Sequence, residues 1–142
     1  MTLEELQELA EKDLKINDIE LDIASLQTPQ IHNKYLKFLT KFKLLLVRAE
    51  DEFRTIKKDK WEYYTGKSDP QVYILKPFHL KILKADVGQY IEADPEWQKA
   101  NQKVKYLEAV VDFLDRSLRQ ISNRTFTIKN AIDWKRFTSG AV

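Results

Sequence analysis

The residues best suited to chemistry lie in one short stretch, Lys57 to Lys67, where a group of lysines is followed by aromatic side chains and a further lysine. Lysine ammonium groups neutralise phosphates, and aromatic rings stack on unpaired bases whatever the base is. Sequence-tolerant binding of a single strand requires both kinds of side chain. The stretch therefore predicts a site for single-stranded nucleic acid. Its expected members are Lys57, Lys58, Lys60, Tyr63, Tyr64 and Lys67.

A plainer interpretation of the same stretch is also open. Lysines near the end of a helix complement the negative end of the helix dipole, and the neighbouring aromatic rings can belong to the core. Composition alone does not decide between a nucleic-acid site and a solvated helix end.

No residue pattern indicates catalysis, a metal or a cofactor. Gly66-Lys67-Ser68 is similar to the end of a phosphate-binding loop, but that motif requires a glycine where this chain has Trp61. The absence of cysteine excludes disulfides and cysteine-based zinc sites. His32 and His79 have no metal-ligand partners at helical spacing. We therefore predict a protein that is not an enzyme and uses no cofactor and no metal.

The elements that must position the lysines and tyrosines are expected to be helices. Only three glycines and four prolines occur in 142 residues, too few for the tight turns of a strand-rich fold. Thr2 followed by Glu5 is a capping box, and the apolar residues behind it predict a first helix that ends near Asp13. The segment from Ile19 to Leu26 is compatible with a helix or an extended chain. We predict an all-α fold.

A long helix is predicted to carry the lysine–tyrosine stretch. Thr28-Pro29 is typical of a helix start, and neither glycine nor proline follows before Gly66. Apolar residues three or four apart predict about nine turns between these points. A loop follows up to Pro70. Val72 to Leu75 has the chemistry of a short strand, and Pro77 prevents one continuous helix through this region.

Asp94-Pro95 repeats the start signal, and the most regular apolar pattern of the chain follows it. Apolar residues recur at alternating spacings of three and four from Trp97 to Ile121, a heptad pattern over more than three repeats. Asn123-Arg124 is expected to interrupt it before a last amphipathic helix over residues 125–137. Two uses of this apolar seam are open: a hairpin between the two long helices of one chain, or packing between subunits.

Charge is segregated along the chain, although the net charge is only +2. Residues 1–27 carry eight acidic and two basic side chains. Residues 28–67 carry ten basic and five acidic ones, and residues 116–142 carry six basic and one acidic. We therefore expect one helical domain with an acidic N-terminal segment (1–27), a long basic helix (28–67) and a helical assembly region (94–142).

Neither the start of the chain nor its most apolar run predicts a membrane location. The acidic start lacks the apolar stretch of a signal peptide. The most apolar run, Leu44 to Val47, is far too short to span a bilayer. These features predict a soluble, cytoplasmic protein.

Three segments of the sequence together resemble a known family. They are Met1 to Gln7, the stretch Lys57 to Asp69 with its tyrosine pair, and Ile121 to Lys129 with the continuation to Gly140. Their order and register over the whole chain resemble the UvsY-type recombination mediators of tailed phages. The resemblance implies a protein that binds single-stranded DNA. It also implies that the protein helps a RecA-like recombinase to displace a single-strand-binding protein and load onto the strand.

The resemblance further implies a ring of six or seven subunits that assembles through C-terminal helices. The basic positions that matter for DNA in the family correspond to Lys58 and Lys60. With this resemblance, the apolar seam is expected to lie at least partly between subunits. The assembly residues expected are Leu114, Leu118, Ile121, Phe126, Ile128, Ile132 and Phe137. The alternative function is a helical adaptor that binds only proteins.

Overall fold

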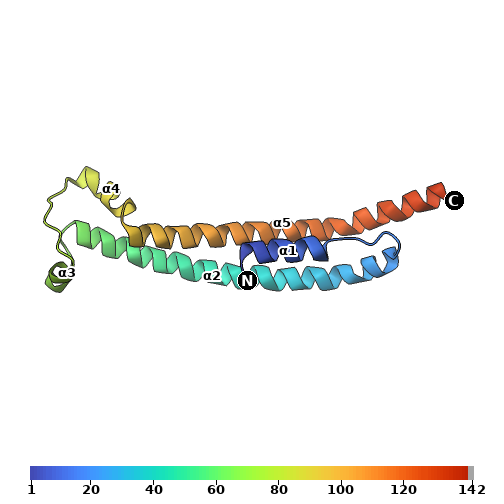
Figure 1. Cartoon of the computed structure of the whole chain (residues 1–142), viewed down its shortest axis with the longest axis horizontal. Coiled ribbons are helices and arrows are strands. Elements are labelled where there is room, and N and C mark those ends of the chain that lie inside the picture. Colours follow the sequence, from blue (N-terminus) through green and yellow to red (C-terminus); the bar gives the residue numbers. More distant parts are fainter. Residues whose placement is uncertain (141–142) are drawn as a thin grey trace. The chain divides into compact units, whose positions relative to one another are not determined.

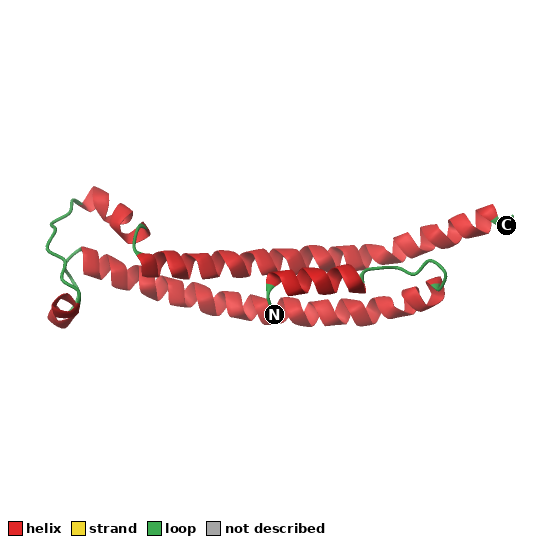
Figure 2. Ribbon diagram, viewed as in Figure 1, coloured by secondary structure: helices red, strands yellow, loops and turns green. Residues whose placement is uncertain are grey.

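The computed structural model describes residues 1–140, and throughout this range the regular elements are helices (Figure 2). This confirms the all-α prediction. In chain order the elements are α1 (Leu3–Asp13), α2 (Leu21–Tyr64), α3 (Pro70–Leu75), the 3-10 turn η1 (Lys84–Asp86), α4 (Val87–Glu92) and α5 (Pro95–Thr138) (Figure 1). None of the described helices is long and apolar enough to cross a membrane.

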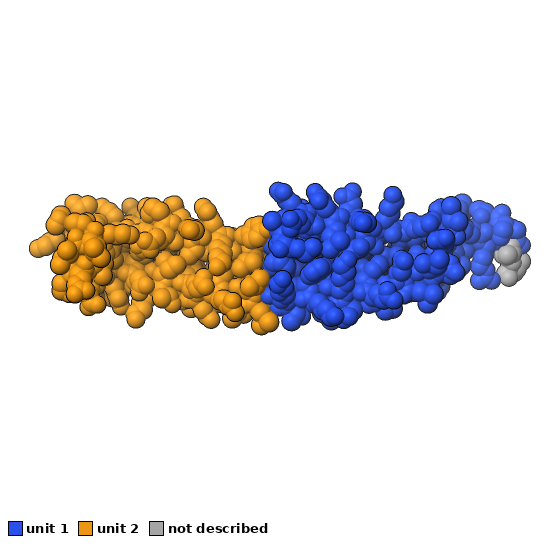
Figure 3. Space-filling model, turned by 60° about the horizontal axis from the view of Figure 1, so that its bottom comes forward, with its two compact units in different colours: residues 1–43, 109–142 blue, residues 44–108 orange. Residues whose placement is uncertain are grey.

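The chain divides into two compact units (Figure 3). The first contains residues 1–43 together with the described residues from 109 onward, and the second contains residues 44–108. Each of the two long helices contributes one part to each unit. Whether the chain acts as a single domain stays a prediction.

The first unit packs α1 against parts of α2 and α5 (Figure 1). The capping box starts α1 as predicted: the Glu5 amide donates to Thr2 Oγ1 at 3.1 Å, and the Thr2 amide donates to Glu5 Oε2 at 2.9 Å. Leu6 on α1 and Tyr35 on α2 are both fully buried. The helix ends at Asp13, where the sequence predicted its end.

The beginning of α2 corrects one prediction. The helix starts at Leu21 rather than at Thr28-Pro29, so the proline lies inside it. The Thr28 hydroxyl donates to the Ala24 carbonyl at 3.2 Å. Leu21 and Ala24 are buried against Ile128 of α5. The extra turns therefore form because their apolar side chains gain a packing partner, which outweighs the cost of the proline.

A second correction concerns α5, which runs without interruption through Asn123-Arg124. Arg124 is only 3% exposed. Its Nη1 donates to the Asp13 carbonyl at 3.0 Å, and its Nη2 lies 3.4 Å from the Ala24 carbonyl. A buried arginine is tolerated inside the helix because distant backbone carbonyls accept its hydrogen bonds.

The second unit contains the end of α2 and the start of α5, joined by a segment with short helices. Gly66, at a φ of +78°, ends α2. The amide of Lys67 donates to the Glu62 carbonyl at 2.8 Å and that of Gly66 to the Tyr63 carbonyl at 3.3 Å. These are the two bonds of a Schellman cap, which favours glycine at the left-handed position.

The short strand expected at Val72 to Leu75 is wrong, because these residues belong to the helix α3. A strand needs a partner for its backbone groups, and the described residues include no other strand. A short helix that starts at Pro70 satisfies part of its own backbone and places the Tyr73 hydroxyl 2.8 Å from the Tyr63 carbonyl.

Candidate nucleic-acid interface

The predicted nucleic-acid residues all lie in the second unit, on the last turns of α2 and just beyond its end. They divide into two groups by exposure. Lys57, Lys58 and Lys67 are exposed, whereas Lys60, Tyr63 and Tyr64 are half-buried. The two groups can therefore contribute to binding in different ways.

The exposed lysines make only weak contacts within the chain. The Lys58 side chain is 74% exposed, and its Nζ lies 3.8 Å from Glu62 Oε1. Lys57 Nζ lies 4.2 Å from the centre of the Phe53 ring, and Lys67 Nζ lies 4.3 Å from that of Trp61. Ion pairs and cation–π contacts at exposed positions contribute little, so these ammonium groups can exchange such contacts for a phosphate.

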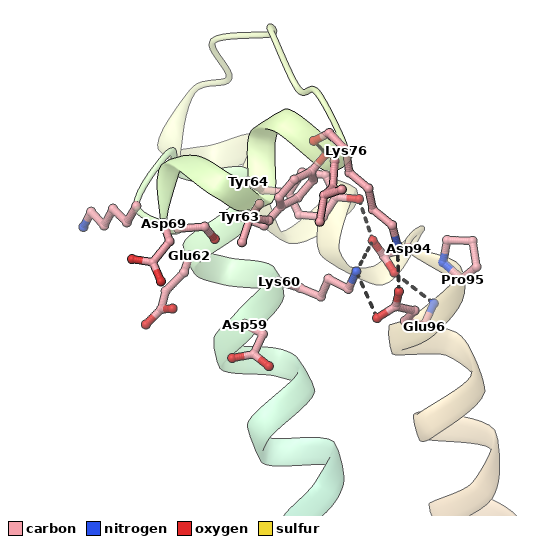
Figure 4. A pocket seen from close by; sticks show the side chains of 14 residues that line it. Asp59, Lys60, Glu62, Tyr63, Tyr64, Asp69, Lys76, Asp94, Pro95 and Glu96 are labelled. Carbon is pink, nitrogen blue, oxygen red and sulfur yellow. Dashed lines mark hydrogen bonds and ion pairs between the residues drawn. The ribbon is translucent and has the colours of Figure 1, made fainter.

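Lys60 has a different environment, which the sequence did not predict. Its side chain is only 14% exposed and points toward the start of α5 (Figure 4). Its Nζ lies 3.2 Å from Asp94 Oδ2 and 3.3 Å from Glu96 Oε2. The charge of Lys60 is therefore neutralised within the chain.

The two tyrosines belong to a cluster of aromatic rings. Tyr63 stacks on Tyr73 with ring centres 5.4 Å apart, and Tyr64 meets Phe78 edge to face at 5.1 Å. Tyr90 packs against both Tyr64 and Phe78. The Tyr63 hydroxyl donates to the Lys76 carbonyl at 2.9 Å. These contacts hold the two tyrosine rings in place at the end of α2.

Asp94 organises the polar part of this region. Its Oδ2 accepts a hydrogen bond of 2.7 Å from the Tyr64 hydroxyl, and its Oδ1 accepts one of 2.9 Å from the Glu96 amide, which caps α5. Burial alone would raise the pKa of Asp94, but these two hydrogen bonds and the Lys60 ammonium hold that pKa below its ordinary value. Burial and the bond to Asp94 raise the pKa of Tyr64.

Glu96 links two lysines. Its Oε1 lies 3.2 Å from Lys76 Nζ, and its Oε2 lies 3.3 Å from Lys60 Nζ. The hydrogen bond from Lys76, followed by the contact with Lys60, lowers the pKa of Glu96. Lys76 and Glu96 were not among the predicted site residues, because sequence spacing gives no signal for contacts between residues 20 or more positions apart.

These groups line a pocket of about 790 Å³ between the end of α2, α3 and the start of α5 (Figure 4). Its charged lining comprises three lysines and five carboxylates: Lys60, Lys67, Lys76, Asp59, Glu62, Asp69, Asp94 and Glu96. Lys60 and Lys76 form ion pairs with Asp94 and Glu96 within this lining, so the pocket suits a polar ligand that can exchange with those pairs. Within residues 1–140 no three histidine or carboxylate side chains gather closely enough to hold a metal ion.

The predicted assembly residues also fall into two groups within the first unit. Leu114, Leu118, Ile121 and Ile128 are buried in the core of one chain. Phe126, Ile132 and Phe137 are exposed, by 66%, 38% and 75% respectively. Most of the apolar seam therefore packs inside the chain. The aromatic residues Phe126 and Phe137, toward the end of α5, are not part of that core.

The chain is similar to known proteins over almost its whole length. Residues 9–141 match the model of a family described as recombination, repair and single-stranded-DNA-binding protein UvsY. The recombination protein UvsY of Enterobacteria phage T4 is 26% identical over 140 residues, which cover 99% of each chain.

Solved structures give the same result. A crystal structure of the bacteriophage T4 recombination mediator protein UvsY, in one lattice, matches with a TM-score of 0.87 and 26% identity over 98% of both chains. A second lattice gives a TM-score of 0.83 and 25% identity, with 97% of this chain and 99% of that chain covered. Because the family model spans nearly all described residues and the fold agrees, the chain belongs to the UvsY family of recombination, repair and single-stranded-DNA-binding proteins.

Proposed function

We propose that this protein is a recombination mediator that binds single-stranded DNA through the end of α2 and catalyses no reaction itself. The observation that carries the proposal is the group of exposed lysines, Lys57, Lys58 and Lys67, beside a polar pocket in a chain of this family. These three exposed lysines, called the rim lysines below, can contact the phosphates of a strand whatever its base sequence. Sequence-tolerant binding requires this chemistry.

Lys60, Tyr63 and Tyr64 have an inner role in this proposal. Tyr63 and Tyr64 fix the shape of the pocket through the aromatic cluster, and their faces are only partly accessible. Lys60 supplies a charge that is already paired and becomes available to a phosphate only by exchange. The rim lysines then contribute most of the salt-dependent affinity.

We further propose that the protein acts as a ring of six or seven subunits in the cytoplasm of the infected cell. Among the predicted assembly residues, Phe126, Ile132 and Phe137 are available for contacts between subunits, because they are exposed within one chain. A strand that crosses several subunits is bound tightly although each subunit makes few contacts, since linked sites act at high effective concentration.

Binding of one strand across several subunits also accounts for help to a RecA-like recombinase. A strand held by several weak sites can be released stepwise, and its stretched shape can favour the recombinase over a single-strand-binding protein. The acidic N-terminal segment, residues 1–27, is the candidate surface for these protein partners, because its charge repels phosphate. The second candidate function remains a helical adaptor that binds only proteins.

Fluorescence anisotropy with labelled oligo-dT separates the two functions. Binding should favour the single strand over a duplex, and should weaken on the order of 10³-fold between 50 and 200 mM salt if about six phosphates are contacted. A chain that binds duplex equally well, or shows no salt dependence, is not the single-strand-binding mediator proposed here. A chain that binds neither is the protein-only adaptor.

A further inference from the structure

Two carboxylates in the pocket are held very differently, although both contact Lys60. Asp94 is 7% exposed and also accepts hydrogen bonds from the Tyr64 hydroxyl and the Glu96 amide. The Glu96 side chain is 56% exposed, and its carboxylate contacts only the ammonium groups of Lys60 and Lys76 among the described residues. Asp94 is therefore a fixed part of the structure, whereas Glu96 can leave at small cost.

The Glu96 carboxylate lies between the ammonium groups of Lys60 and Lys76. It bridges two ammonium groups with one oxygen on each, at 3.2 and 3.3 Å. The two free oxygens of a backbone phosphate carry one negative charge and can accept the same two donors. The exchange replaces one anion by another at Lys60, whose side chain is only 14% exposed, and breaks an exposed ion pair at Lys76, which contributes little stability.

Space and access favour the exchange. Glu96, Lys60 and Lys76 all line the pocket of about 790 Å³ (Figure 4). Val72 and Leu75 add apolar side chains to its lining. The Lys76 side chain is 69% exposed, so a strand can reach it from solvent. With Glu96 displaced, the Lys76 ammonium has no ion-pair partner among residues 1–140, and Lys60 keeps its contacts with Asp94 and the Tyr63 ring.

We propose that Lys60 and Lys76 form a phosphate subsite for single-stranded DNA, and that Glu96 closes this subsite by competing with the phosphate. The inference rests on the proposed function, because it concerns a strand already bound at the lysines of α2. It adds Lys76 as a binding residue and Glu96 as a residue that limits affinity.

The first experiment measures affinity for a short labelled oligo-dT by anisotropy, with wild-type protein and the variant Glu96→Gln. Removing the competing charge should tighten binding by about twofold to fivefold, because the free energy of an exposed ion pair corresponds to a change in affinity of that size. The matched control is Glu52→Gln. Glu52 is 53% exposed and pairs with Lys103 at 3.3 Å in the same unit, outside the pocket. Equal tightening in both variants would reduce the effect to net charge and overturn the proposal.

A double variant then tests whether the gain acts through Lys76. In a Lys76→Ala background, Glu96→Gln should tighten binding no more than the control variant does, because the freed subsite has lost one of its two donors. A full gain without Lys76 would contradict its role. Circular dichroism of each variant checks that the helices persist.

A measurement on the wild-type protein avoids the variants altogether. Labelling with an amine-reactive reagent, read by mass spectrometry, should show Lys76 protected when oligo-dT is bound. Unchanged labelling of Lys76, with Lys58 protected, would refute the subsite and leave the proposed function intact. No oligo-dT binding by wild-type protein would refute the proposed function itself.

Discussion

The hydroxyl of Tyr64 donates a 2.7 Å hydrogen bond to the carboxylate of Asp94, so the last residue of α2 is bonded to the residue that caps α5. Asp94 is almost fully buried. This bond and the Lys60 ion pair hold the two helix ends together at the pocket. The shape of the pocket therefore depends on the negative charge of Asp94, which holds both Tyr64 and Lys60.

Removing this hydroxyl should destabilise the protein measurably. The variant Tyr64→Phe keeps the aromatic contacts but leaves a buried carboxylate with one partner fewer, which should cost about 1.5–3 kcal/mol of unfolding free energy. The matched control is Tyr63→Phe, because the Tyr63 hydroxyl donates to an exposed backbone carbonyl. Urea unfolding followed by circular dichroism compares the two. Equal losses would show that the charge of Asp94 is unimportant.

Acid should weaken the same region. The pKa values of Asp94 and Glu96 are lowered in the folded protein, so at acidic pH the unfolded chain binds more protons than the folded one. The stability that these carboxylates contribute is present above their ordinary pKa of about 4 and is lost as the pH falls below it. Asp94→Asn keeps a good helix cap and should make unfolding free energy less dependent on pH below about pH 4. An unchanged pH profile in urea unfolding would contradict this assignment.

A single exposed lysine tests the rim of the DNA site. Lys58→Ala should weaken oligo-dT binding by about fivefold and reduce the salt slope by about one, without a change in thermal stability. Lys105→Ala is the matched control, since Lys105 is 66% exposed and has a similar helical pair with Glu108. Anisotropy at several salt concentrations gives both quantities. If the two variants bind alike, Lys58 has no special place in binding.

Assembly can be tested without damage to the core. The double variant Phe126→Ser, Phe137→Ser changes two exposed rings, each worth about 1.5–3 kcal/mol if it is buried between subunits. Sedimentation should show a smaller species, and oligo-dT affinity should fall because each subunit binds alone. Leu80→Ser, at a side chain 62% exposed outside the assembly region, is the control. A variant that keeps the full oligomer would place the subunit contacts elsewhere.

Arg124 offers a test of the first unit alone. Arg124→Lys keeps the charge but removes the fork that reaches the carbonyls of Asp13 and Ala24, which should cost about 1.5–3 kcal/mol. Arg119→Lys is the control, because Arg119 is 77% exposed and bonds only a neighbour on its own helix among the described residues. Urea unfolding compares the two variants.

The sequence was sufficient to predict those helix ends whose hydrogen bonds come from neighbouring residues. The capping box at Thr2, the end at Asp13 and the start at Pro95 are all as predicted, because neighbouring residues supply their hydrogen bonds. The errors lie where distant residues decide. Pro29 remains inside α2, and α5 continues through Arg124, because of contacts between segments about 100 positions apart.

The candidate site shows the same division. Composition identified the lysines and tyrosines at the end of α2, which are neighbours in the sequence. It could not identify Lys76 or Glu96, whose ion pairs form only when α3 and α5 are in place. The sequence also carries no sign that Lys60 is paired within the chain. Its partner Asp94 stands directly before Pro95, where it indicates only a helix start.

The bond between Arg124 and the Asp13 carbonyl joins residues 111 positions apart in the chain. During synthesis the acceptor leaves the ribosome long before its donor has been made. The N-terminal helix can pair early with α2, whose Lys34 and Tyr35 both donate to the Asp13 carboxylate, but its bond to Arg124 forms only after most of the chain has emerged. Completion of the first unit is thus tied to the last stage of translation, because a product truncated before Arg124 lacks both this bond and the Ile128 side chain that covers Leu21 and Ala24.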